Sequence, residues 1–457
     1  MFVVHQNQSG IHHLLGALDC PGGTETPHKG SDLQICWSVD SAVQRAVSSV
    51  TSKSAFWLNH PFAVRAASDA DYVKAILQLN GIQPYVPSNK RQMTVKKTFH
   101  VAVCNLRVLA LFNGRTRVST AVYSKVGNLA VKATQALQLD FAFVSVKMTT
   151  SNTLLVASVN PLPPLSKSLA AIFAVGIRRF AEQWRSKSDA QQRIVIGADV
   201  EFVLLTPNGK VSPASLYVPR HGIVGHDALR MNHRRRLYPL VELRPRPAKR
   251  PEQLMLHLLR AMHLAARTIK RPSLRWVAGA MPLRRFAIGG HLHISRFWLS
   301  SVFLRVLDRY LALPLMMCES GASVKRRLKY GRLSDYRRQF HGGFEYRSLP
   351  SWIVEPNLAQ AVISLFYVLA LTFKQLPQEA TVRFADTHFQ RAFYTGDKHA
   401  LLDLVRQGWQ QLDALEPFRQ YREQIAPLRR QSLEMQTWDE QQDVRPAWRV
   451  PPFHRQT

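Results

Sequence analysis

The 457 residues are more than one ordinary domain contains, and a hydrophobic content of 46% excludes a disordered chain. The 61 Lys and Arg residues against 30 Asp and Glu give a formal net charge of +31, which predicts an anionic partner such as nucleotide, nucleic acid, acidic polymer or a membrane surface. The four cysteines lack C-x-x-C spacing, so they indicate neither a structural zinc site nor a disulfide framework and favour a reducing, cytoplasmic setting.

The first third of the chain gives an uneven signal. Residues 1–55 show little periodicity and are left as an unassigned N-terminal segment. Residues 58–82 have the apolar spacing of a helix. A strand pair is predicted over 100–124 with its turn at Asn113-Gly114, followed by a helix over 129–137 and two strands over 141–148 and 153–159.

The proline-rich stretch 160–165 predicts the end of a domain that begins at residue 56. Residues 166–190 then predict a linking helix, 191–376 a second domain, and 377–457 a helical C-terminal extension. Residues 358–373 are apolar but shorter than a membrane span, so a buried core helix and no membrane partner are expected. The basic run Lys325-Arg326-Arg327 is read either as a phosphate contact or as a solvated face.

Four short stretches of the second domain place reactive side chains at alternate positions, as a strand with one polar face requires. They are Asp199-Val-Glu201, Glu242-Leu-Arg244, His291-Leu-His293 and Glu345-Tyr-Arg347. Each intervening residue is apolar or aromatic, so the opposite face is expected to pack on helices. One face of a sheet would therefore collect carboxylates, imidazoles and guanidinium groups.

Burying such groups without partners costs several kcal/mol each, so they need metal ions, anionic ligands or each other. Carboxylates with an imidazole suit Mg²⁺ or Mn²⁺, and arginines suit phosphoryl oxygens. The set is typical of phosphoryl transfer from ATP. Internal salt bridges with hydrogen-bonded histidines remain the alternative for each pair taken alone.

In this order and spacing the sequence resembles the amidoligases of the carboxylate-amine ligase group, distant relatives of glutamine synthetase and glutamate–cysteine ligase. The fragments that carry the resemblance are IGADVEF, VGHDA, VELRP, GGHLHIS, LKYGRLSDYR and GFEYRSLPS. It implies an α+β fold with a glutamine synthetase-like curved antiparallel sheet, and ATP with Mg²⁺ or Mn²⁺ forming an acyl phosphate that an amine attacks. The sequence departs from the family at Val200, where proline is common, and at His226-Asp227-Ala228, where an Asp-Gly step is usual.

The resemblance also implies roles for individual residues. The implied metal ligands are Asp199, Glu201, Glu242, His291 and Glu345. The implied nucleotide-binding residues are His291, His293, Ser295, Tyr330 and Arg347. The implied catalytic residues are Glu201, Arg244, Glu345 and Arg347.

Residues 56–165 resemble the C-terminal part of an ATP-grasp ligase, through LNHPFAVRAASDADYVKAILQLNGI, NLRVLALFNG, ALQLDFAFVSV and LLVASVNPLPP. The acidic magnesium ligands of that fold would fall near Ser145 and Ser158, and only Asn160 of the terminal pattern is kept. Serine hydroxyls do not replace two carboxylate charges. A truncated, non-catalytic ATP-grasp-like unit is therefore expected.

The sequence thus predicts an ATP- and magnesium-dependent carboxylate-amine ligase that acts on a carboxylate and an amine. An acidic peptide or polymer is one candidate substrate, and a homo-oligomer is one candidate assembly. No specific nucleic acid is expected. A metal-dependent hydrolase that uses His291 and His293, and a non-catalytic scaffold that binds polyanions, are the alternatives.

Overall fold

The computed structural model of the protein describes residues 1–6, 8–23, 31–40, 56–87, 94–113, 119–186, 194–227, 229, 237–283, 286–327, 329–340 and 342–451. The chain forms two compact units. Unit 1 comprises Met1–Ser188, Ser300–Arg305 and Pro377–Arg391, and unit 2 comprises Asp189–Leu299, Val306–Leu376 and Ala392–Thr457. Each unit mixes helices with sheet, as an α+β chain requires, but takes segments from distant parts of the sequence, unlike the linear succession expected.

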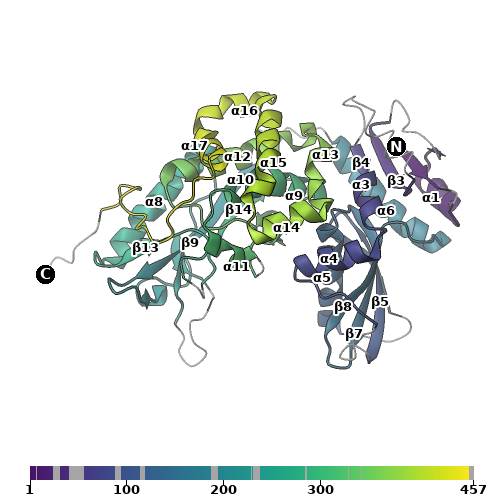
Figure 1. The fold of residues 1–457 in the computed structure, drawn as a ribbon, viewed down its shortest axis with the longest axis horizontal. Coiled ribbons are helices and arrows are strands. Elements are labelled where there is room, and N and C mark those ends of the chain that lie inside the picture. The colour runs from purple at the N-terminus through teal and green to yellow at the C-terminus, as the bar shows by residue number, and fades with distance from the viewer. Residues whose placement is uncertain are drawn as a thin grey trace. The chain divides into compact units, whose positions relative to one another are not determined.

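Unit 1 begins with a parallel sheet in the order β2-β1-β3-β4 (Figure 1). Its strands are β1 (Phe2–His5), β2 (Gly22–Gly23), β3 (Leu33–Trp37) and β4 (Phe56–Leu58), and β1 is followed by α1 (Ile11–Leu18). The helix α6 (Lys167–Arg185) packs against α1 with one apolar face, which includes the buried Phe173 and Ile177. α6 is therefore part of the core of unit 1, although its sequence suggested a linker.

The second sheet of unit 1 is antiparallel, in the order β6-β5-β7-β8. Its strands are β5 (Val95–Cys104), β6 (Arg107–Phe112), β7 (Phe141–Thr149) and β8 (Leu154–Asn160), accompanied by α3 (Pro61–Ala66), α4 (Ala70–Leu79) and α5 (Thr120–Ala136). The strand β5 turns into β6 through Asn105 and Leu106, which both have positive φ. The turn predicted at Asn113-Gly114 is therefore wrong, and Gly114 itself lies outside the described residues. α5 begins where the second strand of that pair was expected.

A buried polar network ties the segment Ser300–Arg305 to the rest of unit 1. Asp140 accepts hydrogen bonds from Arg305 (2.8 Å), from the Ser301 hydroxyl (2.6 Å) and from the Asn59 amide (2.8 Å). Asn59 itself holds a positive φ of 58° and its side chain bonds the backbone of residues 140 and 141. The only acidic residue between 83 and 166 is thus used inside the protein.

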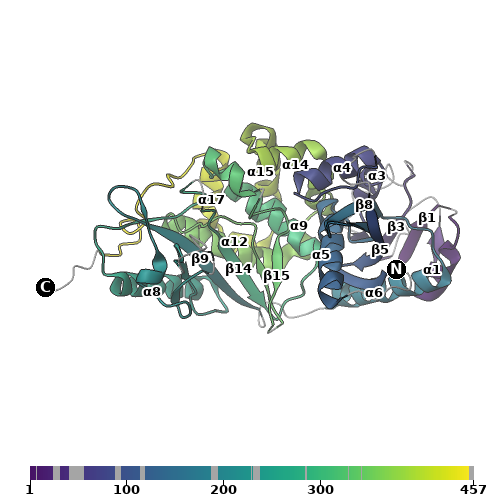
Figure 2. The ribbon, with the colours of Figure 1, turned by 90° about the horizontal axis from the view of Figure 1, so that it is seen from below.

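In the described part of unit 2, eight antiparallel strands form one sheet in the order β11-β12-β9-β14-β16-β15, with β10 and β13 also paired to β9. β9 (Val195–Leu205) lies centrally, and β14 (Gly290–Ser295) and β15 (Tyr336–Arg338) follow to one side of it (Figure 2). The remaining strands are β10 (Val211–Ser212), β11 (Val224–His226), β12 (Leu240–Leu243), β13 (Arg275–Val277) and β16 (Phe344–Tyr346).

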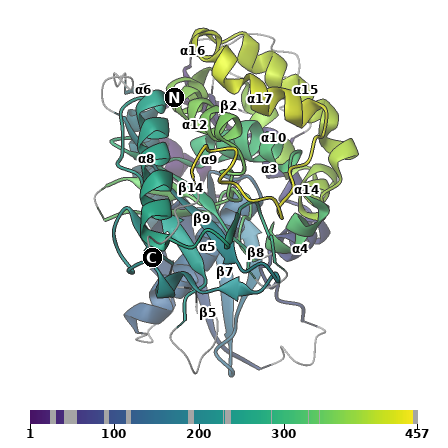
Figure 3. The ribbon, with the colours of Figure 1, turned by 90° about the vertical axis from the view of Figure 1, so that its left-hand side faces the viewer.

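Helices cover the apolar face of this sheet. α8 (Pro251–Ile269) packs on β9, β11 and β12, and α12 (Pro356–Thr372) packs between α8 and α17 (Arg422–Leu433) (Figure 3). The stretch Pro356–Gln375, which is α12 with the helical turn after it, is long and apolar enough to cross a membrane, but 78% of its most apolar window is buried within the protein. The predicted buried core helix over 358–373 is confirmed.

The remaining helices are divided between the two units. They are α9 (Ser301–Leu307), α10 (Leu313–Met316), α11 (Val324–Arg327), α13 (Gln378–Thr381), α14 (Thr387–Thr395), α15 (Lys398–Asp413) and α16 (Glu416–Gln420). Beyond α17 the chain runs in turns, and Trp448 donates a hydrogen bond to the carbonyl of Ile353 (2.8 Å). The C-terminal segment is therefore helical only as far as residue 433, and its last part braces unit 2.

Candidate functional site

The strand register in unit 2 brings the four predicted pairs onto one face of the sheet. Residues directly opposite each other in an antiparallel pair point to the same side. Glu242 is opposite Glu201, His291 is opposite Asp199, and Glu345 is opposite His293. The face thus carries four carboxylates and two imidazoles, as the alternate spacing predicted. It is called the acidic face below.

Three side chains of the acidic face converge. The Nδ1 atom of His291 lies 2.7 Å from Oδ1 of Asp199 and 3.1 Å from Oε1 of Glu345. One potential ligand atom from each residue lies within 4.8 Å of the other two. The second imidazole, His293, places Nε2 3.1 Å from the other carboxylate oxygen of Asp199. Asp199, His291 and Glu345 are therefore the candidate metal centre, and it is assembled from three different strands.

Several buried nitrogen and oxygen atoms at this centre lie close to a polar atom but form no hydrogen bond with suitable angles. They are Oδ1 of Asp199, Oε1 of Glu345, Nε2 of His293 and Nε of Arg347. A buried carboxylate oxygen without a hydrogen-bond donor loses solvation that only a cation or another donor can replace. Two such oxygens beside an imidazole are the donor set that a hard divalent ion prefers. The residues present therefore fit the metal that the sequence predicted.

Glu345 is the centre of a second set of contacts, with arginine. Its side chain is fully buried, and Arg347 Nε lies 3.0 Å from Oε1. Arg337 on β15 places Nη2 2.6 Å and Nε 2.8 Å from Oε2, and Gln339 donates to the same oxygen at 2.8 Å. Arg244 pairs with Glu242. The two predicted arginines therefore contact acids of the acidic face.

Arg337 and Gln339 were missing from the sequence prediction. Their signal was the same alternate spacing, Arg337-x-Gln339, but the intervening Arg338 is charged and exposed, so the apolar half of the pattern is absent. Only the register of β15 with β16, which sets Arg337 opposite Glu345, identifies them.

The other predicted residues lie in different surroundings. Ser295 ends β14 two residues beyond His293, on the same side and half-buried, whereas Tyr330 lies in the loop before β15 with half of its side chain exposed. His226 stacks on Tyr238 (4.5 Å) and points to the other side of the sheet. Asp227 accepts a hydrogen bond from the backbone of Leu229 (3.1 Å), and its charge acts on the acidic face as described next.

The carboxylates of the acidic face repel one another in a buried setting. Burial raises the pKa of Glu201 to about 7 against the opposing charge of His291, and the charges of Asp227 and Asp199 add to the rise. Burial and the charge of Asp199 raise the pKa of Glu242 to about 8. Glu201 accepts a hydrogen bond from the Gly289 amide (2.7 Å), which offsets part of this cost. Both acids would gain from a bound cation.

The converging centre shows the opposite behaviour. Burial alone would lower the pKa of His291, but the adjacent Asp199 and Glu345 carboxylates raise it to about 10. Burial alone would raise the pKa of Asp199, but the two imidazoles hold it well below its usual range. Against burial, His291 also lowers the pKa of Glu345. Without metal, a proton on His291 supplies the positive charge that the two carboxylates need.

These shifts predict how the stability of the metal-free protein depends on pH. Glu201, Glu242 and His291 each have a higher pKa in the folded protein than in the unfolded chain. The stability that each protonated group contributes is therefore lost as the pH rises through its folded-state pKa, which is about 7 for Glu201, about 8 for Glu242 and about 10 for His291. We expect the free energy of unfolding in EDTA to fall between pH 5 and pH 9 by about 1.4 kcal/mol per pH unit for each proton released. Urea unfolding followed by tryptophan fluorescence measures it.

The variant Glu201→Gln should flatten this slope between pH 4.5 and 7, because it removes one of the titrating acids. The exposed Glu416→Gln is the matched control and should leave the slope unchanged. An identical slope in Glu201→Gln and the wild type would contradict the predicted cost of the buried carboxylate.

A buried arginine links the strands β14 and β16 of the acidic face through hydrogen bonds to the backbone next to each strand. Arg326 donates from Nε to the carbonyl of Ile288 (2.7 Å) and from Nη1 to that of Ser348 (3.0 Å), and Nη2 bonds the carbonyl of Leu349. These carbonyls lie just before β14 and just after β16. Its neighbour Arg327 is buried too and pairs with Glu319 (2.7 Å). Both predicted readings of the basic run, phosphate contact and solvated face, are wrong for these two arginines.

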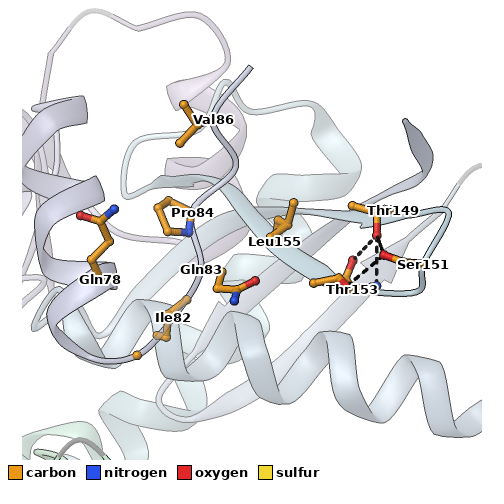
Figure 4. A pocket seen from close by; sticks show the side chains of 10 residues that line it. Gln78, Ile82, Gln83, Pro84, Val86, Thr149, Ser151, Thr153 and Leu155 are labelled. Atoms are coloured by element: carbon orange, nitrogen blue, oxygen red, sulfur yellow. Dashed lines mark hydrogen bonds between the residues drawn. The ribbon is translucent and has the colours of Figure 1, made fainter. Parts of the chain in front are cut away.

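Unit 1 carries its own candidate features. Ser145 and Ser158 are cross-strand partners on β7 and β8, on one face of the antiparallel sheet, so the two positions expected for magnesium carboxylates do lie together. A pocket of about 590 Å³ lies near one end of that sheet (Figure 4). Three of its hydroxyls, Thr149, Ser151 and Thr153, hydrogen-bond one another. None of the described residues that line this pocket carries a carboxylate, so its described lining is chemically unlike the acidic face.

Comparison with known proteins gives one family match. The family model "Phage phiEco32-like COOH.NH2 ligase-type 2" matches residues 196–450, which include the whole acidic face. No curated protein matches the sequence.

Three solved structures resemble parts of the chain. The bifunctional glutathione synthetase of Pasteurella multocida is 12% identical, with a TM-score of 0.34 over 57% of this chain and 48% of that one. The D-alanine–D-alanine ligase of Bacillus anthracis complexed with ATP is 11% identical, with a TM-score of 0.29 over 40% of this chain and 96% of that one. The glutamate–cysteine ligase of Francisella tularensis in complex with AMP is 10% identical, with a TM-score of 0.36 over 53% and 82%. The chain thus spans about half the length of the first of these.

Proposed function

The chain belongs to the phage phiEco32-like COOH.NH2 ligase-type 2 family, and from this premise we propose that it is an ATP- and magnesium-dependent carboxylate-amine ligase. In the proposed reaction a substrate carboxylate takes the terminal phosphoryl group of ATP, and the amine then displaces phosphate from the acyl phosphate. We further propose that the sheet of unit 2 is the glutamine synthetase-like sheet of this reaction. One observation carries the proposal: buried carboxylate oxygens of Asp199 and Glu345 converge with His291 and accept no well-directed hydrogen bond.

Asp199, His291 and Glu345 would hold the first magnesium ion, and Glu201 with Glu242, directly opposite each other on adjacent strands, would hold a second. Bound there, magnesium offsets the negative charge of the phosphates during transfer. The residues themselves supply a rigid arrangement, because each lies on a strand whose register fixes its neighbours. Catalysis by positioning needs such rigidity.

The arginines would bind the transferring phosphoryl group. Arg337 on β15 and Arg347, which follows the last residue of β16, both approach Glu345, and Arg244 lies at the Glu242 end of the same face. A guanidinium group offers five donors in a planar fork, so an arginine that pairs with a carboxylate retains donors for phosphoryl oxygens. Gln339, which also donates to Glu345, would orient this carboxylate.

The metal-dependent hydrolase remains the alternative, but the described geometry does not favour it. A catalytic zinc site commonly takes two or three imidazoles around one ion. Here only His291 belongs to the converging centre, and His293 instead contacts the far oxygen of Asp199. We also propose a cytoplasmic location, in keeping with four free cysteines.

Calorimetric titration with ATP tests the proposed function. We expect wild-type protein at moderate salt to bind ATP with magnesium and far more weakly in EDTA, and the Glu201→Ala/Glu345→Ala double variant to lose the magnesium-dependent part. The Asp403→Ala/Glu416→Ala variant removes two exposed carboxylates and is the control for net charge. Equal ATP binding by all three proteins, or retained zinc with no response to ATP, would overturn the ligase proposal.

A further inference from the structure

The antiparallel sheet of unit 1 has one covered face and one face that α6 covers at the end near Phe141 and that is open to solvent at the other end. α5 covers the first, where Val101 and Val103 are fully buried and Gly127 packs against Val108. Side chains on alternate positions point the other way. The open face, as it is called below, carries His100, Phe112, Phe143, Ser145, Lys147 and Ser158.

Aromatic rings form a platform on the open face. His100 lies parallel to Phe143, with ring centroids 5.7 Å apart and an interplanar angle of 3°, and Phe112 lies 6.3 Å from the same ring. Further along β7, Lys147 places its ammonium group 3.6 Å from the ring centre of Tyr85. His100 and Phe112 are both exposed, Phe112 by 41%. Exposed aromatic side chains in contact with one another form an apolar patch of the kind that marks interaction sites, and their faces can stack on a planar ring.

The strands that carry this platform are basic. β5 to β8 contain Lys96, Lys97, Arg107 and Lys147 and no acid, and the one acid of the sequence between residues 83 and 166 is Asp140. That acid is buried and paired with Arg305, so it offers no negative charge to the surface. The positions where carboxylates would repel phosphate, Ser145 and Ser158, carry uncharged hydroxyl groups, and the Ser145 hydroxyl is hydrogen-bonded to Nδ1 of His100 (2.9 Å).

We propose that the open face binds single-stranded nucleic acid without sequence preference. The bases would stack on Phe143, Phe112 and His100, and Lys147 with the neighbouring basic residues would neutralise the phosphates. Alternate positions on β7 are about 7 Å apart, close to the spacing of bases in an extended strand. A duplex hides the faces of its bases, and an acidic peptide does not use a row of rings, so a single strand fits both features. The proposal goes beyond the ligase activity and does not depend on it.

Fluorescence anisotropy with a labelled 20-residue oligo(dT) tests this proposal on the full-length protein. We expect the Phe112→Ala/Phe143→Ala variant to bind at least tenfold more weakly, and Phe143→Trp to retain binding, because any aromatic ring restores stacking. Phe62→Ala removes an aromatic ring of similar exposure on α3 and is the matched control. His100→Ala, an exposed truncation, repeats the test should the double variant be unstable.

The charge contribution is measured separately. Lys147→Ala should lower the salt dependence of binding by about one released counterion, whereas the exposed Lys125→Ala on α5 should leave it nearly unchanged. Unlabelled oligo(dT) should compete far better than duplex DNA or polyglutamate. Equal oligo(dT) binding by the wild type and both aromatic variants would overturn the proposal, because the binding would then come from nonspecific charge attraction alone. Displacement by ATP at equal nucleotide concentration would also overturn it, and would assign the face to a mononucleotide.

Discussion

Replacing Glu345 by glutamine is expected to remove high-affinity Mn²⁺ binding and to lower magnesium-dependent ATP turnover by about a thousandfold or more. Glu345 is fully buried and contacts both sides of the proposed chemistry, the metal centre through His291 and the phosphoryl group through Arg337 and Arg347. Glutamine keeps the size of the side chain but removes the charge. Electron paramagnetic resonance of added Mn²⁺ and release of ADP measure the two losses.

The control for this variant is Glu416→Gln, which neutralises an exposed carboxylate that pairs with Arg419 in α16. It should bind Mn²⁺ as the wild type does. A thermal unfolding curve of Glu345→Gln is needed beside both measurements, since the variant leaves two arginines without their acid. A folded Glu345→Gln protein that still binds Mn²⁺ tightly would show that the converging side chains are a salt-bridge network and no metal site.

The candidate site was predictable because a strand repeats every two residues. Asp199-x-Glu201 and His291-x-His293 keep that period with apolar residues between them, so their common side follows from the sequence alone. Which side chains meet was not predictable, since this depends on the register between strands that are distant in the chain, such as the strands of Asp199 and His291, whose paired residues lie 92 positions apart. Arg337 was missed for this reason, because only its pairing with Glu345 gives it a role.

The failures in unit 1 and on α11 have local causes. The hairpin turn at Asn105 and Leu106 requires positive φ at both residues, and leucine there is unfavourable, so the Asn-Gly pair further along gave the stronger signal. A run of basic residues in a sequence also predicts a solvated face. The backbone carbonyls that Arg326 contacts come from distant parts of the chain, so the sequence around Arg326 gives no sign of them.

Arg326 carries the second large prediction, because replacing it by methionine is expected to destabilise unit 2 by about 4 kcal/mol. Removing a buried ion can be neutral when an apolar side chain of similar volume fills the space. Here the partners are three backbone carbonyls, of Ile288, Ser348 and Leu349, and each unsatisfied buried carbonyl costs about 1–3 kcal/mol. Since methionine offers no donor, the cost of the carbonyls outweighs the gain from losing a buried charge.

Urea unfolding of Arg326→Met measures this loss, and the neighbouring Lys325→Met is the matched control. Lys325 is exposed on the same helix, so its replacement should change the free energy of unfolding by about 0.5 kcal/mol or less. Because the three carbonyls lie at the start of β14 and the end of β16, the same variant should also weaken Mn²⁺ binding at His291 and Glu345 under conditions where it is folded. A stable Arg326→Met protein with unchanged Mn²⁺ affinity would mean that strand pairing alone holds the two ligands together.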